Sequence, residues 1–439
     1  MPIKIVSSGA KQAPKVVAPK AVKAVKVTPT KMPKQLAKIQ ALCAKLNKEM
    51  DGLGYIGVGS DVHWLDPARI RTGILGFDVL SSGGLPRRSM THLWGPNSVA
   101  KTTTLLMMMA AAQRRGQNSL YAPSETFSKM WARKIGNWIP HDPKEYEGLE
   151  RIKSIEDRHE ARAQMEEYDR GVPGLGQFAL LLHPFGDGLL EGAYQAIESN
   201  VFDIVGVDSL AACKPAKLIE ENEVGDDERG SGKQIQMLIQ FCNKVNSAFG
   251  KRYGEDGAVS PKTGGTFFNE TAVVCINQAL QDQTPVMGPM RGATGIKYKP
   301  SMGVKLMHYW NLSVEFKRGY LDLDEAVDVR IDGEKQGRQK AGIEVNAYCD
   351  KSRVGTPYRT ALWHLYTREH DGHHPGTVDT SREIRVWGVH YNVIEQDGAW
   401  YTMPGGRRVN GKDKVDAILA EDAALRREVE DEVIERCRQ

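Results

Sequence analysis

The stretch LWGPNSVAKTTTLL, residues 93–106, constrains the fold more than any other part of the chain. It joins the β-rich run SMTHLW to a run of helix-forming residues through a short loop that opens at Gly95. A strand, a glycine-containing loop and a helix in this order make up the unit that binds phosphate in parallel α/β sheets. The loop departs from the pattern G-x-x-x-x-G-K-[ST] at one position, because Ala100 stands where the second glycine is expected.

The rest of this loop meets the chemical demands of phosphate binding. Backbone N–H groups at the mouth of a helix point at anionic oxygens, Lys101 can reach the β and γ phosphates, and the Thr102 hydroxyl can hold Mg²⁺. At Ala100 a helical φ costs little, whereas a positive φ costs on the order of 1 kcal/mol. We therefore expect nucleotide binding to survive. The predicted binding residues of the loop are Gly95, Pro96, Asn97, Ser98, Val99, Ala100, Lys101, Thr102 and Thr103.

Strand-like and helical runs alternate beyond this loop. The segments SMTHLW, NSLYAP, FDIVGVDS and TAVVCIN are rich in β-forming residues, and helical stretches such as TTTLLMMMAAAQRRG lie between them. This alternation predicts the α/β class, with a mostly parallel sheet flanked by helices. No apolar run approaches the roughly 20 residues of a membrane span. The six cysteines are scattered without a C-x-x-C pair, which fits a reducing cytosol better than a zinc site or a disulfide framework.

Composition divides the 439 residues into four expected parts. Residues 1–34 hold eight lysines and no acidic residue, so without them the formal net charge of +4 becomes −4. We predict a disordered basic tail there, which is either a solubilising extension or a segment attracted to phosphate backbones. A helix and linker follow at 35–70, an α/β core at 71–375 and a small α+β domain at 376–439. Within the core, the charged segment 144–170 is predicted to be a solvated helical insertion, and the chain is expected to end in an amphipathic helical tail.

Three polar residues are expected to meet the phosphate loop. Glu125, Asp208 and Gln278 are predicted to end three successive strands, and ligands of open α/β sheets bind at the carboxyl ends of the strands. An aspartate in this place holds Mg²⁺ through water, a glutamate polarises the attacking water, and a glutamine senses the γ-phosphate. Together they predict ATP hydrolysis with Mg²⁺ as the metal.

In these motifs the chain resembles the bacterial RecA recombinase family and its phage-encoded UvsX-type relatives. The resemblance lies in TGILGFDVLSSGGLPRRSMTHLWGPNSVAKTTTLLMMMAAAQ, MWARKIG, FDIVGVDSLAACKP, INQ and GAWYT, which occur in family order from about residue 36 to 425. It implies a RecA-like ATPase core with an N-terminal oligomerisation helix and a small C-terminal domain. Glu125 is then the catalytic carboxylate, Asp208 the Walker B acid, and Gln278 the link between the γ-phosphate and DNA.

The resemblance also implies roles that the motifs alone do not give. Trp131 falls where the family places an aromatic ring against the adenine. Lys351 and Arg353 match a basic pair that reaches the ATP of the neighbouring subunit, although by themselves they would be a solvated charge cluster.

The family has two DNA-binding loops. The resemblance matches them to EENEVGDDERGSGK, from about residue 221, and to residues 279–303 of this chain. The first is more acidic than basic, which weakens its assignment. The second has the Gly- and Met-rich composition of a mobile loop that tracks a phosphate backbone. The predicted DNA-binding residues in and just after it are Arg291, Lys297, Lys299 and Lys305.

The function expected from this resemblance is that of an ATP-dependent recombinase in DNA recombination and repair. Such a protein self-associates into a helical filament on single-stranded DNA and exchanges strands with homologous double-stranded DNA, in the cytoplasm and away from membranes. A RecA-fold hexameric helicase or loader motor is one alternative, and a non-hydrolysing DNA-binding regulator that lost turnover through Ala100 is another. The insertion at 144–170, the segment HDGHHPG and the basic tail are additions to the bacterial pattern, and they favour a phage or plasmid homologue.

Overall fold

The fold is described from a computed structural model of the chain. The described residues are 34–49, 67–152, 154–220, 231–250, 252–253, 267–281, 298–301, 304–319, 327–331, 334–339, 341–370 and 372–439. Among them, no helix combines the length and the apolar character that crossing a bilayer requires.

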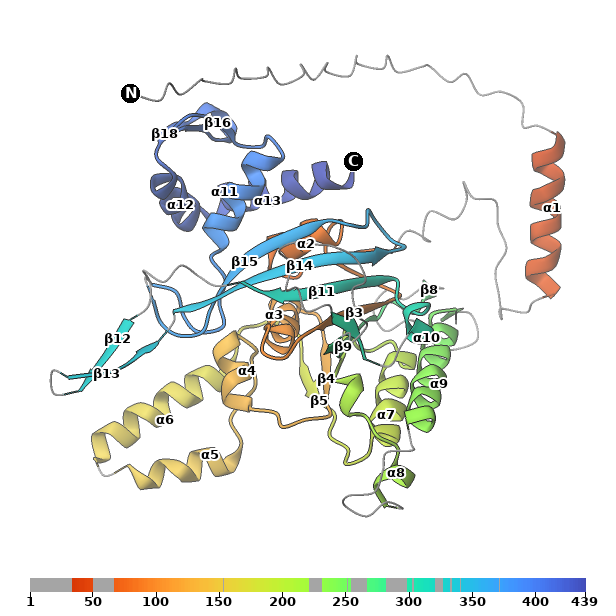
Figure 1. The fold of residues 1–439 in the computed structure, drawn as a ribbon, viewed down its shortest axis with the longest axis horizontal. Coiled ribbons are helices and arrows are strands. Elements are labelled where there is room, and N and C mark those ends of the chain that lie inside the picture. The colour runs from red at the N-terminus through yellow and green to blue at the C-terminus, as the bar shows by residue number, and fades with distance from the viewer. Residues whose placement is uncertain are drawn as a thin grey trace, which may run out of the picture.

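A nine-stranded sheet forms the centre of the molecule, in the order β15-β14-β11-β3-β9-β6-β4-β5 with β10 paired to β9 (Figure 1). The five strands β3, β9, β6, β4 and β5 run parallel, and β11 adds to them in parallel through β3. The strands β14 and β15 extend the sheet antiparallel. The mostly parallel α/β sheet predicted from the alternating sequence is therefore confirmed. The strands of the sheet are β3 Ser89–Gly95, β4 Ser119–Pro123, β5 Phe178–Leu180, β6 Ile204–Asp208, β9 Ala272–Gln281, β10 Tyr298–Pro300, β11 Leu312–Arg318, β14 Gly342–Ser352 and β15 Thr360–Tyr366.

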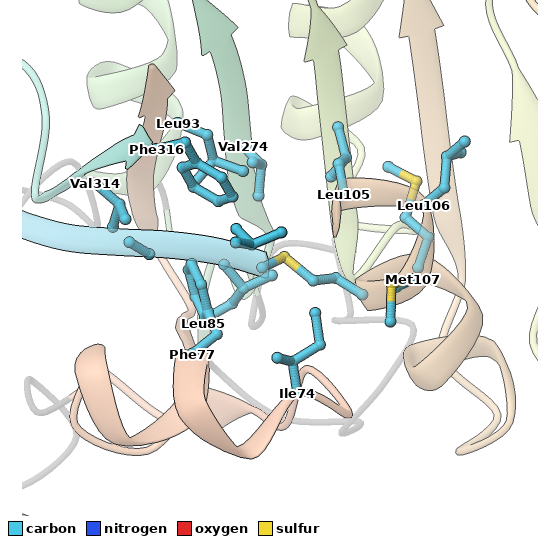
Figure 2. Packing of buried hydrophobic residues seen from close by; sticks show 14 of the residues in the cluster. Ile74, Phe77, Leu85, Leu93, Leu105, Leu106, Met107, Val274, Val314 and Phe316 are labelled. Atoms are coloured by element: carbon cyan, nitrogen blue, oxygen red, sulfur yellow. The ribbon is translucent and has the colours of Figure 1, made fainter. Parts of the chain in front are cut away.

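Each face of the sheet is covered by its own apolar cluster. One cluster packs α3 and α2 against the sheet, as Figure 2 shows for Phe77, Leu93 and Phe316. The other cluster packs α7 and α9 on the opposite face. Gly206 in β6 permits the close approach of α3, since a Cβ there would lie 2.6 Å from Met109 Cε. The helices of the core are α2 Leu75–Leu80, α3 Lys101–Gln113, α4 Lys129–Ile135, α7 Gly186–Glu198, η4 Leu210–Ala212, α8 Ala216–Glu220, α9 Ser231–Gly250 and α10 Val304–Met307.

Pairs of short strands lie outside the central sheet, and one helix precedes the core. The strand pairs are β1 Arg69–Ile70 with β2 Leu85–Pro86, β7 Arg252–Tyr253 with β8 Phe267–Phe268, and β12 Val327–Ile331 with β13 Glu334–Gln339. The helix α1 Lys34–Glu49 occupies the segment where the apolar periodicity predicts a helix. The domain boundaries at 34, 70 and 375 stay predictions.

The charged insertion is helical and stands out from the core beside α4 (Figure 1). It consists of α5 Pro143–Glu147, η3 Gly148–Arg151 and α6 Ile155–Arg170, and none of the residues of α6 is buried. Its base is nevertheless tied to the core, because Arg133 Nη1 of α4 lies 2.6 Å from Glu145 Oε1 and Trp138 Nε1 donates to Tyr168 O at 3.0 Å. The prediction of a solvated helical segment therefore holds for α6, while α5 is pinned to the helix that precedes it.

The C-terminal unit is an α+β structure with its own apolar cluster, which also takes in Leu75 and Val79 of α2. Its elements are α11 Thr380–His390, β16 Glu395–Asp397, β17 Trp400–Thr402, η6 Pro404–Gly406, β18 Arg408–Asn410, α12 Lys412–Glu421 and α13 Ala423–Arg438. The expected helical tail consists of two helices, because Asp422 is extended and its carboxylate accepts from the N–H groups of Ala424 and Leu425. This N-cap separates two helices where the composition suggests one.

Candidate nucleotide-binding site

The phosphate loop joins β3 to α3 as predicted, but with a strained backbone. Gly95 has φ +154°, and a Cβ there would collide with the Phe316 carbonyl of the neighbouring β11. Ser98 and Ala100 both adopt the left-handed conformation, with φ of 59° and 66°. Ala100 is the N-cap of α3 rather than its first helical residue. The costlier of the two expected conformations is thus present, and the methyl group costs about 1 kcal/mol there.

Replacing Ala100 with glycine is expected to change ATP affinity by less than about fivefold, because the left-handed conformation costs alanine only about 1 kcal/mol, which corresponds to about that factor in affinity. Isothermal titration calorimetry with ATP and Mg²⁺ measures this difference. A gain of two orders of magnitude or more would show that the alanine is a functional lesion and that the loop binds poorly as it stands.

Lys101 folds back over its own loop. The residue is buried, and its Nζ donates to Gly95 O at 2.9 Å and to Pro96 O at 2.6 Å. Burial lowers the pKa of Lys101 to about 8, while the negative charges of Asp208 and Glu125 act in the opposite direction. The ammonium group is thereby held at the loop that a triphosphate would occupy.

Asp208 lies at the end of β6 and is fixed by two hydroxyl groups. Its Oδ2 accepts from Thr102 Oγ1 at 2.6 Å and from the Tyr121 hydroxyl at 2.9 Å. Burial raises the pKa of Asp208, and these hydrogen bonds partly oppose the shift. Burial and the adjoining carboxylate also raise the pKa of Tyr121, so its hydroxyl keeps its proton and donates. Thr102 and Asp208, predicted as the metal-binding pair, are therefore in direct contact.

Glu125 and Gln278 also meet at this edge of the sheet. Glu125 Oε1 lies 3.4 Å from Gln278 Nε2 and 3.4 Å from Ser209 Oγ. The strand ends differ from the expectation in two details: β4 ends at Pro123, two residues before Glu125, and β9 runs past Gln278 to Gln281. The extension arises because β9 continues into a hairpin with β10.

These residues surround one cavity of about 490 Å³, a size suited to a nucleotide. The predicted residues that line it are Asn97, Ser98, Val99, Ala100, Lys101, Thr102, Thr103, Glu125, Trp131, Asp208 and Gln278. Trp131, on α4, lines the cavity, and its contact with the adenine stays a prediction. Five lining residues were not predicted, namely Ser209, Ile276, Ile343, Leu365 and Thr367. Ile343 and Leu365 come from the antiparallel strands β14 and β15. No local sequence motif predicts that these strands pair with the core.

Lys351 and Arg353 do not belong to the described residues that line this cavity. Lys351 pairs with Ser313 near the start of β11, and Arg353 N donates to Asn311 O. This end of β11 lies beside the middle of β3, since Leu312 pairs with Thr91, whereas the phosphate loop follows the end of β3. The Lys351 ammonium contacts Met307 O, and burial, followed by the charge of Arg353, lowers the pKa of Lys351. The pair is therefore separated from the site of its own chain.

The predicted DNA-binding residues are only partly described. Lys299 in β10 and Lys305 in α10 are both exposed. Arg291 and Lys297 lie outside the described residues, as do positions 221–230 of the other predicted loop.

Comparison with known proteins finds relatives that match most of this chain. The family model of the RecA C-terminal domain matches residues 383–438. The Protein RecA of Bordetella avium is 25% identical over 366 residues, which cover 83% of this chain and 80% of the relative. The Protein RecA of Acidothermus cellulolyticus is 25% identical over 389 residues, which cover 87% of this chain and 88% of the relative.

A crystal structure of the RadB recombinase is 17% identical, with a TM-score of 0.36, and the match covers 68% of this chain and 97% of that one. The cavity and sheet define a phosphate-loop protein of the α/β class. The matches to RecA over most of the chain, with the C-terminal domain match, support a RecA-family protein.

Proposed function

We propose that this protein is an ATP-dependent DNA recombinase. It binds ATP with Mg²⁺, assembles as a helical filament on single-stranded DNA, and pairs that strand with homologous double-stranded DNA. The observation that carries the proposal is the convergence of Lys101, Asp208, Glu125 and Gln278 on one cavity, with Gln278 on the strand that leads into the β9–β10 hairpin.

The residues present fit the nucleotide and its metal. Lys101 neutralises the phosphates, and the Thr102 hydroxyl and the Asp208 carboxylate offer the hard oxygen atoms that Mg²⁺ prefers. Mg²⁺ held by Thr102 and Asp208 would supply positive charge that stabilises the negative charge developing on the phosphate oxygens. Glu125 orients the attacking water and takes its proton. Trp131 packs against the base.

Gln278 is the residue that transmits the state of the site to DNA. Its side chain reaches Glu125, while its backbone carbonyl accepts from Ser301 N at 2.9 Å across the base of the hairpin. Asn277 Nδ2 strengthens this connection between β9 and Ser301 by donating to Ser301 O at 3.0 Å. A γ-phosphate that draws the Gln278 side chain away from Glu125 therefore acts directly on the segment that carries Lys299.

Assembly brings the second half of the site from a neighbouring copy. Lys351 and Arg353 lie away from the cavity of their own chain, so a role at ATP requires that they reach the nucleotide of an adjacent protomer. A cationic pair bridged to phosphate across an interface is partly desolvated, and it couples ATP to filament growth.

Replacing both Lys351 and Arg353 with alanine is expected to leave ATP binding by the isolated protomer largely intact, because that protomer's own loop holds the phosphates. The stimulation of ATP hydrolysis by single-stranded DNA and its dependence on protein concentration should collapse by a factor on the order of 10². ATPase rates measured across a range of protein concentrations, with and without DNA, test this expectation. Exchanging the exposed pair Lys412 and Lys414 for alanine is the control. If the first variant keeps wild-type DNA stimulation, the basic pair is only a surface cluster.

Strand exchange itself is the test of the proposed function. The protein, ATP and Mg²⁺ are mixed with circular single-stranded DNA and a linear duplex of the same sequence, and joint molecules are followed on gels. Joint molecules are expected with homologous duplex and ATP only. Equal yields with heterologous duplex, or none at all from protein that hydrolyses ATP, would contradict the proposal.

The reducing environment implied by six unpaired cysteines is consistent with a cytoplasmic place of action.

A further inference from the structure

Tyr121 is a buried polar residue beside the cavity, and the proposed hydrolysis of ATP assigns it no part. It sits in β4, is 3% exposed, and places its hydroxyl 2.9 Å from Asp208 Oδ2. Its ring packs against Phe127 and Phe178, with ring centroids 5.4 Å and 6.4 Å away. The ring alone makes these apolar contacts, and the hydroxyl group adds only the hydrogen bond to Asp208. Without its bond to Asp208, the buried hydroxyl would destabilise the core.

The two hydroxyl groups that hold Asp208 belong to different parts of the fold. Thr102 lies in the first turn of α3, at the phosphate loop, whereas Tyr121 lies inside the sheet on the strand next to β6. Both bonds end on Oδ2, so together they fix the rotation of a carboxylate that is itself 8% exposed. Hydrogen bonds from hydroxyls to a carboxylate are short and strong.

Only one of these two bonds is independent of the ligand. The Thr102 hydroxyl oxygen is also needed at Mg²⁺, so its contribution to Asp208 is shared once a nucleotide is present. Tyr121 approaches from the core and is not among the described residues that line the cavity, so its bond to Asp208 does not compete with the metal.

We propose that Tyr121 is a positioning residue that presets the Asp208 carboxylate for the Mg²⁺ of the bound nucleotide. This inference rests on the proposed function, because it assigns a role toward the same metal. It predicts that the hydroxyl of Tyr121 contributes to the affinity for Mg²⁺ and not to the affinity for the nucleotide alone.

The test is Tyr121→Phe, which keeps the ring and removes only the hydroxyl. Binding of a fluorescent non-hydrolysable ATP analogue is followed while Mg²⁺ is titrated. The Mg²⁺ concentration for half-maximal binding is expected to rise on the order of tenfold, as for loss of a hydrogen bond to a charged group. Affinity for the analogue in EDTA should equal that of the wild type, and ATP hydrolysis lost at low Mg²⁺ should return at high Mg²⁺.

Two further variants make the result specific. Tyr194→Phe loses a hydroxyl that donates to Glu198 Oε1 at 2.8 Å on α7, away from the cavity, and it should titrate like the wild type. Asp208→Asn should need more Mg²⁺ than Tyr121→Phe. If Asp208→Asn shifts the titration but Tyr121→Phe does not, the role of Tyr121 is wrong and the metal site stands. If neither variant shifts it, the metal site of the proposed function fails and the role of Tyr121 fails with it.

Discussion

Replacing Lys101 with alanine is expected to weaken ATP binding on the order of 10³-fold while the protein stays folded. The ammonium group bonds to the carbonyls of Gly95 and Pro96, which water can reach once the side chain is removed. The phosphates, by contrast, would lose their main positive charge. Isothermal titration calorimetry gives the affinity, and circular dichroism checks the fold.

The matched control for Lys101 is Lys134→Ala. Lys134 lies on α4 near the same cavity but is exposed and does not line it. It should bind ATP like the wild type. Unchanged ATP affinity in Lys101→Ala would remove the basis for calling residues 95–102 a phosphate loop.

Replacing Glu125 with glutamine is expected to lower the ATP turnover rate by a factor on the order of 10², with ATP affinity within a few-fold of the wild type. Glutamine preserves the size of the side chain and can still contact Gln278 and Ser209, but it cannot take a proton from water. Single-turnover hydrolysis in the presence of single-stranded DNA separates this chemical step from product release. Glu428→Gln, at an exposed position on α13, is the control.

Near-normal hydrolysis by Glu125→Gln would move the catalytic role to another carboxylate. Among the described residues that line the cavity, Asp208 is the other acidic side chain, and it is already bonded to two hydroxyl groups. In that case Gln278 would no longer contact the catalytic carboxylate, because its side chain contacts Glu125 and not Asp208.

The sequence predicts those parts of the site that depend on local order along the chain. The loop before α3 follows an apolar run, and so do Glu125 after β4, Asp208 at the end of β6 and Gln278 within β9. Parallel strands bring their carboxyl ends to one edge of a sheet. For this reason the amino-acid sequence alone predicts that Glu125, Asp208 and Gln278 meet the loop of Lys101. The RecA family was predicted on the same motifs and is confirmed by the relatives and the C-terminal domain match.

The parts that the sequence did not predict depend on contacts between distant segments. Ile343 and Leu365 reach the cavity because β14 and β15 pair antiparallel beyond β11, and no spacing in the chain encodes that pairing. Tyr121 resembles any buried aromatic residue until its hydroxyl is seen on Asp208. The left-handed φ of Ala100 is equally a property of the folded loop. The break at Asp422 did have a local signal, an aspartate before a helical run, which composition alone concealed.

The most direct test of the proposed recombinase is electron microscopy of the protein with single-stranded DNA and a non-hydrolysable ATP analogue. We expect an open, right-handed helical filament in which the cavity of one protomer faces Lys351 and Arg353 of the next. Without the analogue, the filaments should shorten or disappear, because the interface would lack the phosphate that joins those cations to the neighbouring loop. Closed rings of protomers under the same conditions would contradict the proposal and point to a translocating motor with the same fold.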